Sequence, residues 1–83
     1  YFTTNPMDFN PVGLTMTTYP GTKNGAIIKW CDPTNGATVF EWNEDLKHGS
    51  HYHVFMPNLN GLHDGTHYYP GQRVPEPWNS LYF

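Results

Sequence analysis

Two short runs rich in β-branched and aromatic residues, with a turn signal between them, constrain the fold of this chain most. The runs cover residues 26–31 and 37–42, and the loop that joins them ends in Asn35-Gly36. Two β-prone runs joined by a short loop that ends in Asn-Gly are typical of a β-hairpin. The sequence therefore predicts an antiparallel pair of strands. Because side chains alternate between the two faces of a strand, Lys29 and Glu41 can share a face.

Further β-prone runs extend this pair to a small sheet. Residues 50–56 predict another strand, and residues 66–69 predict a short one that ends at Pro70-Gly71. Residues 43–49, between two of these strands, predict a loop or a single helical turn. We expect one domain over residues 1–83, of the α+β class, with a small antiparallel sheet of about four strands and little helix.

The two ends of the chain carry the weakest signals. Residues 1–25 predict an irregular lead-in, although residues 14–19 alternate like a first strand. Residues 74–78 contain two prolines, which predict a polyproline-like segment rather than regular helix or sheet. Trp78 and Phe83 are the expected anchors of this tail.

Composition limits how such a sheet can be stabilised and what it can bind. Of the 83 residues 17% are aromatic and only 13% are charged, so we expect a core built from rings. The formal net charge is −3 with histidine neutral, which is not the basic profile of a typical nucleic-acid-binding domain. A single cysteine, Cys31, excludes an internal disulfide. No segment approaches the roughly 20 apolar residues of a membrane span, so we expect no membrane insertion.

All five histidines lie within a window of 20 residues in the second half of the chain: His48, His51, His53, His63 and His67. Histidine serves as general acid, general base or metal ligand near neutral pH. On the predicted strand, His51 and His53 are two residues apart and therefore lie on one face, with Tyr52 and Val54 facing the core.

Three interpretations of this pair stay open. The first is acid–base cleavage of RNA without a metal, in which the 2′-hydroxyl is the nucleophile and a cation such as Lys29 or Arg73 stabilises the phosphate charge. The second is a metal site, for which zinc would be the default ion; its ligands would be the two strand histidines with His63 or His67 and Asp64. The third is a purely structural role for the histidines.

Candidate substrate-binding residues also have plain alternatives. Lys29, Lys47 and Arg73 offer cations for a phosphate backbone, and each can instead be a solvated charge. Tyr69 can stack on a base, although core packing is the commoner duty of an aromatic side chain.

Several short motifs resemble one class of bacterial protein. They are GTKNG at 21–25, IKW at 28–30, FEWNEDL at 40–46, GSHYHV at 49–54, HY at 67–68, PG at 70–71 and VPEPW at 74–78. In these motifs the chain is similar to the C-terminal toxin domains of polymorphic toxins, which are the variable tips of Rhs/YD-repeat and contact-dependent growth inhibition proteins. The likeness spans about residues 8 to 83.

The resemblance implies a small, metal-independent ribonuclease with a compact sheet like those of barnase, EndoU, colicin E5 and RelE. It implies cleavage of RNA, with tRNA among the candidate substrates, to a 2′,3′-cyclic phosphate and a 5′-hydroxyl. His51 and His53 would form the acid–base pair, and Glu41 or His67 would orient or share that work. No cofactor and no metal ligand are expected on this interpretation.

The resemblance also implies partners and a place of action. Such domains are delivered at the cell surface or by secretion as part of a larger carrier, act in the cytoplasm of a target bacterium and are neutralised by a cognate immunity protein. The low basicity of this chain departs from the usual nuclease, and a helper protein in the target cell is one way to supply RNA binding. The competing functions are a metal-dependent nuclease or hydrolase and a binding module without catalysis.

Overall fold

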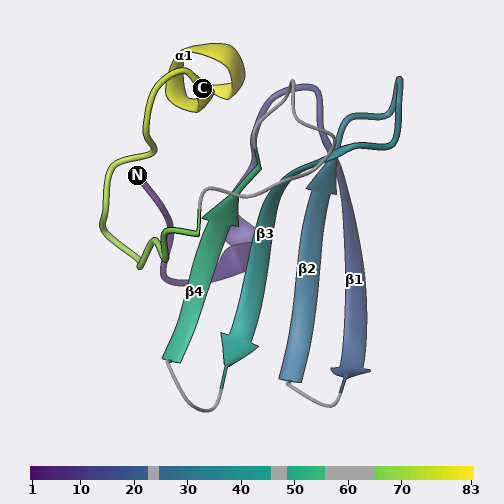
Figure 1. Ribbon diagram of the computed structural model, residues 1–83, viewed down its shortest axis with the longest axis vertical. Helices are drawn as coiled ribbons and strands as arrows, with labels where there is room; N and C mark the ends of the chain where they lie inside the picture. Colours follow the sequence, from purple (N-terminus) through teal and green to yellow (C-terminus); the bar gives the residue numbers. More distant parts are fainter. Residues whose placement is uncertain (23–24, 46–48, 56–64) are drawn as a thin grey trace.

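Four antiparallel strands in sequence order form one open sheet in the computed structural model, which describes residues 1–22, 25–45, 49–55 and 65–83. The sheet order is β1-β2-β3-β4 (Figure 1). The strands are β1 (Thr15–Thr22), β2 (Gly25–Cys31), β3 (Thr38–Asp45) and β4 (Gly49–Val54). Within the described ranges, helix is confined to short segments near the two termini, so the prediction of a small α+β fold with about four strands is confirmed.

The predicted central hairpin is present as β2 and β3. Its loop is closed by backbone hydrogen bonds in which Gly36 donates to the carbonyl of Asp32 and Asp32 donates to that of Ala37, at 2.7 and 2.9 Å. Gly36 has a φ of +73°, a left-handed conformation that glycine adopts without a Cβ clash. The register places Lys29 opposite Glu41, so these two side chains share a face as predicted.

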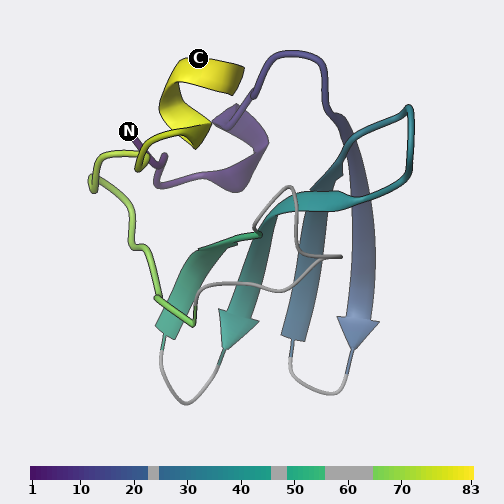
Figure 2. The same ribbon diagram turned by 45° about the horizontal axis from the view of Figure 1, so that its top comes forward.

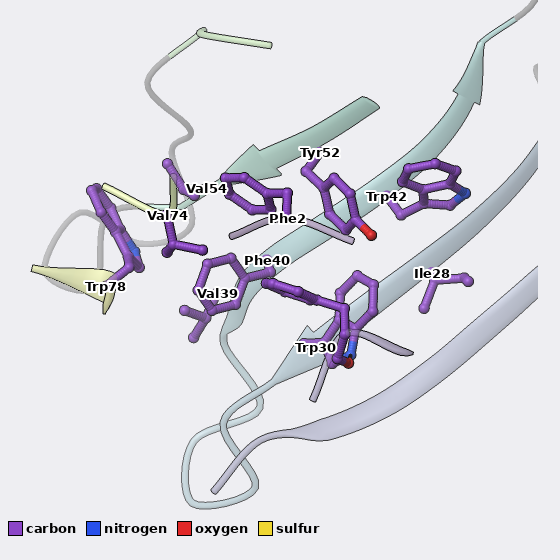
Figure 3. Packing of buried hydrophobic residues seen from close by; sticks show 11 residues of the cluster. Phe2, Ile28, Trp30, Val39, Phe40, Trp42, Tyr52, Val54, Val74 and Trp78 are labelled. Atoms are coloured by element: carbon purple, nitrogen blue, oxygen red, sulfur yellow. Dashed lines mark hydrogen bonds between the residues drawn. The ribbon is translucent and has the colours of Figure 1, made fainter. Parts of the chain in front are cut away.

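The core is made of rings that the strands present on one face of the sheet, joined by residues from both ends of the chain (Figure 3). Trp30, Phe40 and Tyr52 are each at most 2% exposed. Ring pairs such as Phe9–Phe40, with centroids 5.1 Å apart, show that the aromatic composition does fill the interior. The buried set comprises Phe2, Phe9, Ile28, Trp30, Val39, Phe40, Trp42, Tyr52, Val54, Val74 and Trp78.

The N-terminal segment contributes more order than the lead-in prediction allowed. Strand β1 is longer than the run at residues 14–19 suggested, and a 3₁₀ turn at Pro6–Asp8 precedes it. Phe2 and Phe9 flank this turn and are almost fully buried against the sheet. A segment without strand pattern can therefore still supply core residues, because burial of its aromatic rings stabilises it.

The C-terminal tail differs from the predicted polyproline segment at its end. A short helix, α1 (Trp78–Tyr82), begins at the expected anchor Trp78, whose Nε1 donates to the Phe55 carbonyl at 3.0 Å. The helix lies beside the N-terminal segment (Figure 2), where Val12 donates a backbone hydrogen bond to the Tyr82 carbonyl at 2.8 Å. Phe83 remains half-exposed, although its ring lies 5.2 Å from that of Phe9.

Two predicted boundaries shift. Residues 43–45 continue strand β3 instead of forming a loop. The short strand expected at residues 66–69 is reduced to a single bridge between Tyr52 and Tyr68, with backbone hydrogen bonds of 2.7 and 2.9 Å. Among the described residues, no helix has the length and apolar character required to cross a membrane.

Candidate functional site

The face of the sheet opposite the aromatic core carries a cross-strand row of polar side chains. Thr17 pairs with Lys29, Lys29 with Glu41, and Glu41 with His53. Cβ atoms of directly opposite residues in such pairs lie about 4.5–5.5 Å apart, so neighbouring members of the row are within side-chain reach. We call this surface, with His51 and the segment that carries His67 and Tyr69, the polar face. Its existence follows from strand alternation, because Tyr52 and Trp42 occupy the core side.

Lys29 is the cation of the row. Its Nζ lies 5.5 Å from the centroid of the Tyr19 ring, on the strand next to it. Lys29 and Glu41 are both partly exposed, and Tyr19 is 46% exposed, so solvent and a ligand can reach this part of the polar face. An ammonium group on an exposed sheet face can bind a phosphate group as a point charge.

His51 and His53 point toward each other from strand β4, with their Nε2 atoms 3.0 Å apart and ring centroids at 4.7 Å. The Nδ1 of His51 lies 2.8 Å from the Gly49 carbonyl and donates to it, because a carbonyl oxygen can only accept. This bond assigns the proton of neutral His51 to Nδ1 and leaves the Nε2 lone pair directed at His53.

His67 joins this pair through a contact distant in sequence. The bridge between Tyr52 and Tyr68 sets residues 67–69 alongside β4, so the neighbours of Tyr68 fall on the polar face. The His67 ring stacks on that of His51, with centroids 4.0 Å apart and an interplanar angle of 8°. It also meets the His53 ring edge-on at 5.0 Å. The predicted group His51, His53 and His67 is therefore brought together, and we call it the histidine cluster.

Burial is uneven within the histidine cluster. His51 is only 2% exposed, whereas His53 and His67 are partly exposed. We expected two solvent-reachable imidazoles side by side on the strand. The two rings do face one another, but the expected exposure is wrong for His51, and the Nδ1 atom of His53 is buried as well. His51 is enclosed because His67 covers it.

The remaining candidate residues lie at the edge of the cluster, away from it or outside the described residues. Tyr69 is 39% exposed, and its ring centroid lies 6.1 Å from that of His51, at the edge of the cluster. Arg73 is exposed in the segment after Gly71 and lies outside the cross-strand row. Three further candidates, Lys47, His63 and Asp64, lie outside the described residues, as does His48.

Sequence reasoning missed two residues that shape the site. Gly49 provides the carbonyl that orients His51, and its φ of +77° lies in the left-handed region that other residues rarely adopt. Asn43 lies directly opposite His51 on β3. The glycine before the His-x-His run was a usable signal for the first, whereas the second required the strand register.

The polar face combines groups that can accept a proton, donate a proton and hold an anion. Glu41 and His53 are adjacent across two strands, and Lys29 follows on the next strand. The histidine cluster at one end of this row offers three nitrogen atoms that all lie within 4.8 Å of one another. No protein-family model, no curated protein and no solved structure matches the chain.

Proposed function

We propose that the polar face cleaves RNA by acid–base catalysis without a metal. The observation that carries this proposal is the strand register that sets Lys29, Glu41 and His53 side by side on a partly exposed surface. RNA brings its own nucleophile, the 2′-hydroxyl, so a base, an acid and a cation are sufficient for the reaction.

Roles within the row follow from the chemistry of each group. A carboxylate accepts a proton, so Glu41 takes the proton from the 2′-hydroxyl as that oxygen attacks the phosphorus. A protonated imidazole donates, so His53 protonates the departing 5′-oxygen. Lys29 stabilises the negative charge that develops on the phosphoryl oxygens. The bond to the 5′-oxygen breaks and leaves a 2′,3′-cyclic phosphate and a 5′-hydroxyl.

His51 serves as a positioning residue in this scheme. It is buried and fixed by the Gly49 carbonyl, and its Nε2 meets that of His53 at 3.0 Å. Proton transfer to a substrate requires the His53 ring to turn from this contact toward the open face. Catalytic geometry often forms only in the substrate complex, so the resting contact is compatible with the role.

The test compares two glutamates of the same strand. Glu41 faces the row, while the exposed Glu44 lies opposite Ser50 and has the strand parity of the core side. We expect purified chain to cut total RNA in EDTA, Glu41→Gln to lower the rate by about 10²–10⁴-fold, and Glu44→Gln to keep it. Mapped products should carry cyclic phosphate ends.

Two outcomes would contradict the mechanism. Intact RNA at every protein concentration would refute the proposed ribonuclease activity. Cleavage that disappears in EDTA and returns with Zn²⁺ would favour the metal-dependent alternative.

We propose the biological setting from the motif resemblance alone: a toxin domain delivered as part of a carrier, active in the cytoplasm of a target bacterium and bound by an immunity protein. Production of the chain inside a bacterium should arrest growth, and Glu41→Gln should relieve the arrest. Undiminished toxicity of Glu41→Gln would point to a binding module or another activity.

A further inference from the structure

We propose that His51, His53 and His67 form a binding site for a divalent transition-metal ion of the Zn²⁺ type. The three side chains come from two segments that meet only in the fold, and their ligand nitrogens lie within 4.8 Å of one another. Zn–N bonds of about 2.0–2.1 Å on a tetrahedral ion set ligand nitrogens about 3.3 Å apart. Side-chain rotations alone can therefore close the cluster around an ion.

The hydrogen bonding of His51 already has the form that metal ligation requires. A ligand imidazole usually donates its second N–H to a carbonyl or carboxylate, which fixes the tautomer and the ring orientation. Here Nδ1 donates to the Gly49 carbonyl at 2.8 Å, and the Nε2 lone pair is directed into the cluster. The left-handed backbone of Gly49 sets the position of that carbonyl.

His67 is the side chain that has to move most for a metal ion to bind. Its ring lies parallel to that of His51 at 4.0 Å, so the lone pairs of the two rings run side by side rather than toward one point. The His67 ring has to tilt out of the stack to bind, and its partial exposure leaves room for this movement. The Nε2 atoms of His51 and His53, at 3.0 Å, need to separate by only about 0.3 Å.

The donor set selects the class of ion. Three imidazole nitrogens without a carboxylate favour Zn²⁺, Cu²⁺ or Ni²⁺ over Mg²⁺ and Ca²⁺, which prefer oxygen ligands. Three protein ligands also leave a fourth position open on a tetrahedral ion.

Metal binding and the proposed cleavage exclude each other, because both use the same imidazole of His53. A bound ion would hold the ring in the cluster and occupy the nitrogen that moves the proton. Zn²⁺ should therefore inhibit the proposed cleavage reversibly. Binding of the ion does not itself depend on the proposed function.

Binding is measured without RNA, by titrating metal-free chain with Zn²⁺ in competition with a chromophoric chelator. We expect one ion per chain and a loss of affinity of at least about 100-fold in His67→Ala, since the variant lacks a ligand rather than an outer partner. Cys31→Ser is the control variant, because a cysteine thiolate is the other side chain that commonly binds Zn²⁺. This variant should bind Zn²⁺ as the wild type does. Cys31 is not a member of the cluster, and its Sγ lies 3.6 Å from the Thr38 hydroxyl, within hydrogen-bonding distance for sulfur.

Imidazole nitrogen NMR of the wild-type chain provides a readout that needs no variant. At one equivalent of Zn²⁺ the signals of all three rings should change together, with His51 keeping its proton on Nδ1. Absence of saturable binding, or wild-type affinity in a folded His67→Ala, would overturn the site. Cleavage of RNA in EDTA without Zn²⁺ binding would reject the metal site and support the proposed function. Zn²⁺ binding without RNA cleavage would support the metal site and reject the proposed function.

Discussion

Strand β4 shows two different chemistries on alternate residues. On one face Tyr52 and Val54 are fully buried among aromatic rings, whereas on the other face His51 and His53 meet each other and His67. Two polar atoms of the core are tied to backbone carbonyls: the Tyr52 hydroxyl donates to Thr3 at 2.8 Å and Trp30 Nε1 donates to Phe9 at 3.1 Å. A third, Trp42 Nε1, is buried without a hydrogen-bond partner among the described residues. In the cluster, His51 is tied to the backbone by its bond to the Gly49 carbonyl, and its other ring nitrogen meets the imidazole of His53.

Within one small sheet, the residues that stabilise the fold and the residues available for chemistry therefore lie on opposite faces. The core face buries aromatic rings against one another, which stabilises the fold. The polar face holds groups that can exchange protons or ligands with a bound molecule. Substitutions on the two faces should therefore be distinguishable by whether they change unfolding or activity.

The largest expected effect is on the core face, at Phe40. Its ring is fully buried and contacts Phe2, Phe9 and Tyr82, so Phe40→Ala should lower the free energy of unfolding by about 3–5 kcal/mol. The whole free energy of unfolding of a native protein is only about 5–15 kcal/mol. Urea denaturation measures the change. Tyr19→Ala, an exposed aromatic of the polar face, is the control and should lose far less; equal losses would contradict the division of faces.

The next effect is on the polar face, at His53. His53→Ala should reduce RNA cleavage by about 10²–10⁴-fold, because it removes the proton donor of the row. The same variant should change unfolding by less than about 1 kcal/mol, since the side chain is only partly buried. Initial cleavage rates and urea denaturation give the two values. Full activity in His53→Ala would remove it from the mechanism.

A smaller effect distinguishes the two candidate cations. Lys29→Ala should lower kcat/KM for RNA by about 10²-fold, as expected for loss of one stabilising group at a phosphate. Arg73→Ala should have a much weaker effect, because Arg73 is exposed and outside the row. Steady-state kinetics on a short RNA would rank the variants. The opposite ranking would move the phosphate site away from the sheet.

The smallest effect is on the pH dependence of stability, through Tyr52 on the core face. Burial raises the pKa of the Tyr52 phenol, and the negative charge of Asp8 adds to this, while the hydrogen bond with Thr3 opposes it. A raised pKa in the folded state means that stability is complete below the ordinary tyrosine value of about 10 and declines as pH rises through the folded pKa. Tyr52→Phe should lose about 1 kcal/mol at pH 7 and show a shallower decline above pH 10. Denaturation at both pH values measures this, and an unchanged decline would contradict it.

Local signals in the sequence were sufficient for much of the sheet. The hairpin at Asn35-Gly36 and the alternation of His51 and His53 with Tyr52 and Val54 could be predicted because each depends on neighbouring residues. Helix α1 at Trp78 was missed because the prolines before it dominated the local pattern, whereas burial of Trp78 stabilises the helix.

Contacts between distant residues account for what could not be predicted. His67 stacks on His51 only because Tyr68 bridges to Tyr52, and the same packing buries His51. The row of Lys29, Glu41 and His53 depends on the register between β3 and β4, which sets Glu41 opposite His53. Strand periodicity gives the face of each residue but not its neighbour across the sheet.

Side-chain NMR of the chain in EDTA, during titration with a non-cleavable 2′-O-methyl RNA, shows whether RNA binds to the polar face. Ring signals of His53 and Tyr19 on the polar face should shift and saturate together, while those of Phe40 and Trp30 on the core face should stay in place. Shifts confined to exposed residues near the termini, such as Val12 and Leu81, with unchanged His53 signals, would show that RNA does not bind where the proposed chemistry requires it.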